Sequence, residues 1–172
     1  MTCKFRVQEL EYIRGAFRTG AIYKLMDWIC KSFNELTVGE LYAVLQLRNM
    51  VFVVEQNCIY QDADDKDQYS YHLMCWDGHL LIAYTRILPA GISYAESSIG
   101  RVVVLPGARK NGAGKRLMEI TIEKLLILFG RVPIKIGAQL YLKKFYESLG
   151  FQQCSDIYLE DGIQHIEMLL IP

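Results

Sequence analysis

The sequence lacks the features that attach a protein to a membrane or to nucleic acid. No uninterrupted apolar run is long enough to span a bilayer or to serve as a secretory signal, because charged residues recur through the first 25 positions. The 19 basic and 19 acidic residues cancel, and no run of Lys or Arg is long enough to neutralise a row of phosphates. We therefore expect a cytoplasmic protein that binds no nucleic acid and no membrane, with any anion site confined to a local loop.

The cysteines are scattered and lack the density of a disulfide scaffold, which argues against such a scaffold and against a cysteine-based zinc site. The five cysteines are odd in number and show no paired metal-ligand spacing. Reduced thiols in a cytosolic protein explain them best, and we expect no metal. The positions are Cys3, Cys30, Cys58, Cys75 and Cys154.

The sequence does contain enough apolar material for one core. Its 172 residues, 52% of them hydrophobic, fit a single compact domain, and two full domains would be cramped. Residues 1–25 have poor periodicity and are interpreted either as a loosely ordered N-terminal extension or as a helix. We place the domain itself at 26–172.

The first clear element is a helix over 37–51. Thr37 followed by Glu40 predicts a capping box, in which side chains satisfy the free backbone N–H groups of the first turn, and apolar residues then recur at helical spacing. The segment 57–68 holds four aspartates and cannot build an apolar face. It therefore predicts a loop.

The remaining elements alternate between strands and helices. Two β-rich runs joined by Asp77-Gly78 predict a hairpin, and the β-branched run that follows predicts a central, buried strand. Crossover helices after the third and fourth strands then indicate an α/β (α+β) fold with a mixed central β-sheet flanked by helices. The predicted elements are strands over 71–76, 79–88, 98–105 and 132–138, helices over 109–129 and 140–149, and a closing hairpin over 156–170 that turns at Asp161-Gly162.

The segment most informative about function lies between the central strand and the next helix, at 109–115. A helix N-terminus exposes unpaired N–H groups and the positive end of the helix dipole, and small residues at 112–114 let an anion approach the backbone. Arg109, Lys110 and Lys115 add positive charge, so the segment fits a pyrophosphate, although glycines before a helix also serve tight turns. It is not a nucleotide P-loop, because no Gly-Lys-Ser/Thr ending is present.

Two motifs resemble those of the GNAT superfamily of N-acetyltransferases. The R-x-x-G-x-G run at 109–114 is similar to the Q/R-x-x-G-x-G/A signature with which that family holds the pyrophosphate of coenzyme A. The F-Y-x-x-x-G-F run at 145–151 is similar to the pattern of its later helix, whose tyrosine approaches the sulfur. The two motifs in this order are more specific than either alone, and they imply the GNAT fold.

Over about 26–170 the chain also resembles the ElaA-like group of bacterial GNAT proteins. Few families share the whole set of matching pieces. Gln139 stands where many GNAT proteins have an Asn near the cofactor, and 1–25 has no counterpart. The matching pieces are Leu47-Arg48, the run 51–56, Tyr60-Gln61-Asp62 with Asp64 and Asp67, the runs 100–104 and 137–139, and the run 160–168 with one unmatched position.

The resemblance implies acetyl-CoA as cosubstrate and assigns residues to it. In the family, the strand that corresponds to 102–104 hydrogen-bonds the pantetheine arm, and its N–H groups stabilise negative charge on the acetyl oxygen. Tyr146 corresponds to the tyrosine near the sulfur and is the candidate general acid. The residues expected to bind the cofactor are Val102, Val103, Val104, Arg109, Lys110, Asn111, Gly112, Ala113, Gly114, Lys115 and Gln139.

An amine must lose a proton before it attacks a thioester, so the reaction also needs a base or a water chain. Glu55, at the end of an apolar run, is the candidate base, because partial desolvation would favour its protonation. Asp64, Asp67, His72 and His165 are rivals, but the loop aspartates also fit a solvated charge cluster, and histidines within strands are often structural.

The acceptor cannot be identified from the sequence. Arg48 either anchors the acidic loop or binds a substrate carboxylate, and the residues assigned to substrate binding are Arg48, Asp64, Asp67 and His72. The leading hypothesis is an acetyltransferase that acts on a small-molecule amine or a protein amino group. An enzyme similar to acyl-homoserine-lactone synthases and a non-catalytic CoA-binding sensor are the alternatives, and a homodimer is left open.

Overall fold

One mixed sheet organises the part of the chain that the computed structural model describes, residues 26–172. The extension predicted over 1–25 lies outside these residues. The strands are β1 (Met26–Ser32), β2 (Tyr71–Asp77), β3 (Leu80–Leu88), β4 (Ser97–Val104), β5 (Ile134–Gln139), β6 (Gln152–Gln153), β7 (Tyr158–Glu160) and β8 (Ile163–Leu170).

The strands follow the order β1-β2-β3-β4-β5-β8-β6, and β7 pairs with β8 outside this path. Neighbouring strands are antiparallel, except that β4 and β5 run parallel. The prediction of a mixed sheet with the β-branched strand at its centre is therefore confirmed, because β4 has three strands of the path on each side.

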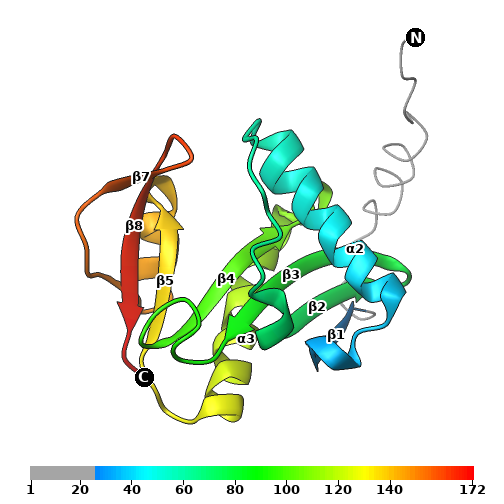
Figure 1. Ribbon diagram of the computed structural model, residues 1–172, viewed down its shortest axis with the longest axis horizontal. Helices are drawn as coiled ribbons and strands as arrows, with labels where there is room; N and C mark the ends of the chain where they lie inside the picture. Colours follow the sequence, from blue (N-terminus) through cyan, green and yellow to red (C-terminus); the bar gives the residue numbers. More distant parts are fainter. Residues whose placement is uncertain (1–25) are drawn as a thin grey trace.

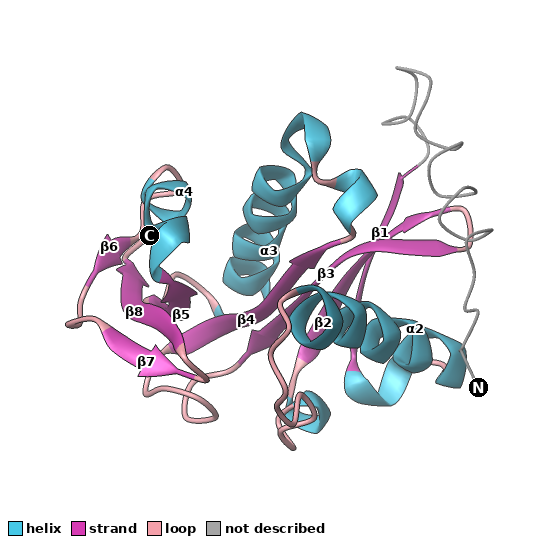
Figure 2. Cartoon of the chain, turned by 90° about the horizontal axis from the view of Figure 1, so that it is seen from above, coloured by secondary structure: helices cyan, strands magenta, loops and turns pink. Residues whose placement is uncertain are grey.

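Helices cover both faces of the sheet. Helix α2 (Val38–Arg48) lies on one face, and α3 (Ala113–Phe129) lies with α4 (Lys143–Glu147) on the other, as Figure 2 shows. The predicted apolar stripe of α3 packs inward, since Leu117 and Leu125 are fully buried. As the crossover between β4 and β5, this helix allows the two strands to run parallel.

The predicted capping box starts α2. Thr37 Oγ1 accepts a hydrogen bond from the N–H of Glu40 (3.2 Å), and the Glu40 carboxylate accepts one from the N–H of Thr37 (2.8 Å). The helix does not end at 51 as predicted, because the chain continues beyond Arg48 as a π-helical segment, Asn49–Glu55. Segments of this kind are frequent at functional sites, and this one ends at a predicted site residue.

Glycine geometry sets the start of α3 and the end of α4. The helix predicted from residue 109 begins at Ala113, because Gly112 has a φ of +78°, outside the helical range. Two 3₁₀ turns fill the interval after β4. The helix predicted over 140–149 is a 3₁₀ turn followed by α4, and it stops before Gly150 (φ +93°), as expected.

The two predicted hairpins are present. The closing hairpin turns at Asp161-Gly162, where both residues have positive φ, as predicted. The first hairpin turns at Gly78-His79 instead of Asp77-Gly78, because Asp77 is still paired with Leu80. Strands β1 and β6 were not predicted. The first borders the aperiodic segment, and the second has only two residues, too few for a periodic pattern.

Strands β4 and β5 separate soon after they begin. They are paired only at Ser97↔Ile134 and Ser98↔Lys135, and the two halves of the sheet diverge beyond this point (Figure 1). The edge of β4 that faces β5 therefore has no strand partner over 99–104. Unpaired backbone at the centre of a sheet needs another hydrogen-bonding partner, so this opening is the natural place for a ligand.

The acidic loop after the π-helical segment is held against the sheet by ion pairs. Arg48 is fully buried and donates through Nε to Asp62 (2.7 Å) and through Nη1 to Asp67 (2.9 Å). A buried guanidinium is tolerated only when such contacts replace its water. We call this set of side chains the Arg–Asp cluster, and its members are Arg48, Arg86, Arg101, Asp62, Asp64 and Asp67.

Arg86 of β3 holds the same loop at two further points. It donates to Asp64 (2.7 Å) and to Asp67 (2.8 Å). Burial by itself raises the pKa of Asp67, but the charges of Arg48 and Arg86 outweigh burial and hold that pKa below its ordinary value. These aspartates are thus ionised structural partners of the arginines, and the description of a solvated charge cluster does not apply to Asp67.

We expect Arg48→Met to lower the free energy of unfolding by about 3–5 kcal/mol, because it removes one partner from the buried Asp67 carboxylate and one from the partly buried Asp62 carboxylate. Urea unfolding measures the loss. Lys31→Met is the control: Lys31 pairs with Glu40 at 2.7 Å at a partly exposed site, where removing a pair costs about 1 kcal/mol or less. Equal losses in the two variants would show that the cluster contributes no more to the free energy of unfolding than a partly exposed ion pair.

Candidate functional site

The open edge of β4 forms the floor of the candidate site. Val102 is half-buried and Val103 and Val104 are buried, so their side chains belong to the core while their backbone borders the opening. An extended ligand arm can bind such an edge as an additional strand would, through main-chain hydrogen bonds. The structure thus places the segment 102–104 on the strand that borders the opening, where the peptide groups that do not face β3 are open to a linear ligand.

The N-terminus of α3 lies just beyond the end of β4. Gly112 and Gly114 leave the first turn open: a Cβ at Gly112 would meet nothing within 4 Å, and one at Gly114 would meet only Phe145 Cζ, at 3.9 Å. Ala113 begins the helix, so its free N–H groups and dipole face this opening. The Phe145 contact also brings the two sequence motifs together, because it joins α4 to the first turn of α3.

Positive side chains surround this helix terminus. Lys110, in the same 3₁₀ turn as Asn111, and Lys115 are exposed and have no ion-pair partner among residues 26–172. Arg109 differs: its Nε donates to the Val104 carbonyl (3.0 Å), and its two Nη atoms donate to Glu55 (2.6 and 2.7 Å). Arg109 is therefore held between β4 and the π-helical segment.

Tyr146 lies on α4, on the other side of the same opening. It is 6% exposed and packs edge-on against Phe145 and Phe151, with ring centroids 5.0 and 6.0 Å apart. Burial raises the pKa of Tyr146 to about 12. Its hydroxyl therefore stays protonated at neutral pH and can donate a proton, but cannot serve as a base there.

A second wall of the opening lies on the α2 side of the sheet. Gln139, at the end of β5, donates through Nε2 to Gln56 Oε1 (3.4 Å). Cys58 Sγ donates to the Asp161 carbonyl (3.9 Å), which joins the segment after Glu55 to the turn between β7 and β8. The π-helical segment and the closing hairpin therefore approach each other across the end of β5.

The residues assigned to substrate binding lie deeper than that assignment requires. His72 is fully buried, its Nε2 donates to the Asp67 carbonyl (3.0 Å), and its Nδ1 accepts from the Tyr84 hydroxyl (2.8 Å). Arg48 and Asp67 are buried in the Arg–Asp cluster, and Asp64 is bound by Arg86. This geometry favours the alternative interpretation, in which Arg48 anchors the acidic loop.

His165 differs from His72, because one of its nitrogens has no hydrogen-bond partner among residues 26–172. Its Nδ1 lies 2.9 Å from the Ile163 carbonyl, and since a carbonyl only accepts, Nδ1 carries the hydrogen of the neutral ring. Nε2 then has a free lone pair. The ring stacks on Tyr158 (5.8 Å between centroids) and is paired across β5 and β8 with Gln139.

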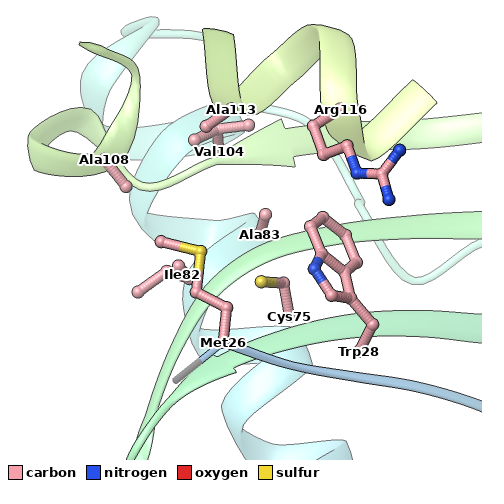
Figure 3. A pocket seen from close by; sticks show the side chains of 9 residues that line it. All are labelled: Met26, Trp28, Cys75, Ile82, Ala83, Val104, Ala108, Ala113 and Arg116. Atoms are coloured by element: carbon pink, nitrogen blue, oxygen red, sulfur yellow. The ribbon is translucent and has the colours of Figure 1, made fainter. Parts of the chain in front are cut away.

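A separate cavity of about 490 Å³ lies beneath the first turn of α3, on the side of β1 and β2 (Figure 3). Its lining is mostly apolar and does not include Tyr146, Gln139 or His165. It shares Val104 and Ala113 with the candidate site but none of the candidate proton donors and acceptors, so we do not assign the chemistry to it. Six of its lining residues are Met26, Trp28, Val104, Ala108, Ala113 and Arg116.

Neither a membrane-spanning helix nor a metal site is found between residues 26 and 172. None of the helices there combines the length and apolar character needed to cross a bilayer. No group of three or more His, Cys, Asp or Glu side chains in that range is arranged to hold a metal ion.

Four residues at or near the site were not singled out from the sequence. Arg86 and Arg101 are the charged residues of two strands that are otherwise uncharged, and a charge in a largely buried strand is a signal of a buried partner that could have been used. Gln56 and Tyr158 carried no comparable signal, because a polar loop residue and a strand aromatic are common everywhere.

Comparison with known proteins identifies the relatives of this chain. The protein E. coli ElaA is 42% identical over 146 residues, which cover 84% of this chain and 95% of ElaA. A protein of Schizosaccharomyces pombe is 43% identical over 147 residues, 84% of this chain and 97% of its own length. The resemblance to ElaA-like proteins is confirmed, and it is not confined to bacteria.

Solved structures agree with this relationship. A Pseudomonas aeruginosa structure described as an acyl-CoA N-acyltransferase shares 42% identity with a TM-score of 0.81, covering 84% of this chain and 99% of that one. The crystal structure of E. coli ElaA shares 41% identity with a TM-score of 0.80 and the same coverage. The family model described as "Acetyltransferase (GNAT) domain" matches residues 42–171. The chain therefore belongs to the GNAT acetyltransferase family.

Proposed function

We propose that this protein is an acetyl-CoA-dependent N-acetyltransferase that transfers an acetyl group to a primary amine of a small molecule or protein, and that 26–172 is its catalytic domain. The observation that carries the proposal is the unpaired edge of β4, which leads directly to the open N-terminus of α3. An extended pantetheine arm along the edge would place its pyrophosphate at the helix terminus. Membership of the GNAT family supports this choice of ligand.

The pyrophosphate would be held by backbone and by lysine. The free N–H groups around Ala113 and Gly114 can donate to phosphate oxygens, and Lys110 and Lys115 supply charge that reaches the same turn. Arg109 contributes only when its pair with Glu55 opens or is shared with the ligand. Glu55 thus affects cofactor binding only through its ion pair with Arg109.

Calorimetric titration with acetyl-CoA tests the cofactor site, and the variant Gly114→Asp makes the test specific to the N-terminus of α3. Gly114 has no positive φ and free space for a Cβ, and an acidic residue in the first turn favours the helix dipole, so we expect unchanged or higher stability. The new carboxylate faces the pyrophosphate, so we expect acetyl-CoA affinity to fall about tenfold or more. Gly114→Asn, with nearly the same size and no charge, is the control and should lose much less.

Binding and turnover are then separated by measuring thiol release from acetyl-CoA with butylamine, tyramine, spermidine and a lysine-containing peptide. Release with one of these amines supports the transferase and indicates its acceptor class. Tight binding without release from any amine would favour a CoA-binding module, and no binding by the wild-type protein would overturn the proposal.

Tyr146 is the proposed general acid. Acetyl-CoA supplies an activated acyl group whose thiolate must leave, and a hydroxyl with a pKa of about 12 is still protonated when that charge develops. Tyr146 reaches the opening from α4, beside the Phe145 contact with the first turn of α3. Its buried ring fixes the position of the hydroxyl.

We expect Tyr146→Phe to lower kcat about 10²-fold and to leave acetyl-CoA affinity and stability nearly unchanged. The ring and its packing remain, and no hydrogen bond of the hydroxyl to residues 26–172 is lost. Steady-state kinetics and calorimetry give the two values. A variant with full activity would remove Tyr146 from the mechanism.

His165 is the side chain that we propose as proton acceptor for the amine. Glu55 is bound by both Nη atoms of Arg109, and His72 has both nitrogens engaged inside the core. His165 lies in register with Gln139, on the face of β8 away from the core, and Gln139 contacts Gln56 after the π-helical segment, so we expect the free Nε2 on the α2 side of the opening. There it can accept a proton directly or through one water.

We expect His165→Gln to lower kcat about 10²-fold, while Glu55→Gln keeps kcat within about threefold. Steady-state rates with the fastest amine of the panel, measured from pH 5.5 to 9, decide between the two candidates. His79→Gln, at an exposed turn, is the control. A large loss in Glu55→Gln with no loss in His165→Gln would reverse the assignment.

A further inference from the structure

Strand β4 carries a β-bulge just after it leaves β5. Arg101 and Val102 stand opposite the single residue Thr85 of β3, a two-against-one arrangement that bends the bulged strand and changes the direction of its peptide groups. The bulge lies within the unpaired edge of β4 that borders the opening. The flanking pairs are Tyr84↔Val103 and Arg86↔Gly100.

Arg101 has a backbone conformation that its side chain disfavours. Its φ is +50°, in the left-handed region, where the Cβ of an L-residue approaches the following carbonyl oxygen. In bulges that require this conformation, the position is usually occupied by glycine. Here a large charged residue occupies it, so another interaction must stabilise the bulge.

The stabilising interaction is the attachment of Arg101 to the acidic loop. Its Nε donates to the Asp62 carboxylate (2.7 Å), and its Nη2 donates to the Asp62 carbonyl (3.0 Å). The guanidinium also lies over the ring of Tyr60, 5.8 Å from its centroid. Two hydrogen bonds to one residue fix the orientation of the guanidinium, and through it the bulged backbone.

The loop that provides these contacts is held independently of Arg101. Asp62 also accepts from the fully buried Arg48 (2.7 Å), and Asp64 accepts from Arg86 (2.7 Å). The loop is therefore a fixed support against which Arg101 is held. Removing the Arg101 side chain would release β4 from the loop without releasing the loop from the sheet.

We infer that Arg101 is a positioning residue: the Arg–Asp cluster holds it in the left-handed conformation, and the resulting bulge sets which N–H groups of the segment 102–104 point into the opening, toward the acyl carbonyl, and which point toward β3. This rests on the proposed function for the identity of the acyl group. The cluster thereby serves the acyl-transfer site from outside it, and Arg101 itself needs no contact with either substrate.

Replacing Arg101 by alanine and by glycine separates the two roles of this residue. Both variants lose the contacts with Asp62, but only alanine keeps the steric cost of positive φ. With acetyl-CoA and the fastest amine of the panel, we expect Arg101→Ala to lower kcat about tenfold, which corresponds to about 1.4 kcal/mol, with smaller effects on KM. We expect Arg101→Gly to recover most of the wild-type kcat.

Two measurements free of activity accompany the kinetics. Urea unfolding confirms that both variants fold. Amide hydrogen exchange over 101–104, without acetyl-CoA, should be faster in Arg101→Ala than in the wild-type protein and close to wild type in Arg101→Gly. The exchange result stands even when no amine is acetylated, so failure of the proposed function and failure of this inference are distinguishable.

Equal loss of kcat in the alanine and glycine variants would overturn the inference, because the guanidinium would then act by its charge and not through the backbone. Unchanged exchange over 101–104 in Arg101→Ala would also overturn it, because the bulge would then persist without its support.

Discussion

The burial of Arg48 is the constraint on which the arrangement of the acidic loop and its attachment to β3 and β4 depend. A fully buried guanidinium requires carboxylates at fixed positions, and the chain provides them from a loop that has no secondary structure over most of its length. The loop therefore acquires its conformation from ion pairs and not from backbone pairing. Through Arg86 and Arg101 the same aspartates contact β3 and β4, so one cluster connects helix, loop and the centre of the sheet.

The separation of β4 from β5 is the second determinant of the site, and it gives the opening two chemically different sides. On the side of α3 and α4 the opening has a helix N-terminus, lysines and a buried tyrosine hydroxyl, which suit an anionic thioester cosubstrate. On the side of α2 it has the end of the π-helical segment, Gln139 and an imidazole with a free lone pair. Strand β4 lies between the two sides, and its backbone borders both.

The sequence predicted most elements correctly where one local rule decides the outcome. The capping box at Thr37 and the paired positive φ angles at Asp161-Gly162 depend only on nearby residues. Roles that depend on distant partners were not accessible. The sequence makes Glu55 a candidate base, whereas its ion pair with Arg109, 54 residues away in the chain, is visible only in the structure. For Asp67, the sequence offers Arg48 as one possible anchor of its loop but gives no sign of the second arginine, Arg86.

Arginines and lysines have different roles near the site, and the difference follows from their side-chain chemistry. Arg48, Arg86, Arg101 and Arg109 all use their planar fork in paired contacts with carboxylates of the protein itself, where fixed geometry matters. The lysines at the start of α3 remain exposed, where a flexible point charge can follow a phosphate as it arrives and leaves. A protein without net charge can in this way maintain a local anion site, because most of its acidic residues near the site are already neutralised by arginine. The positive potential at the helix terminus then depends on the few cations that the fold leaves unpaired.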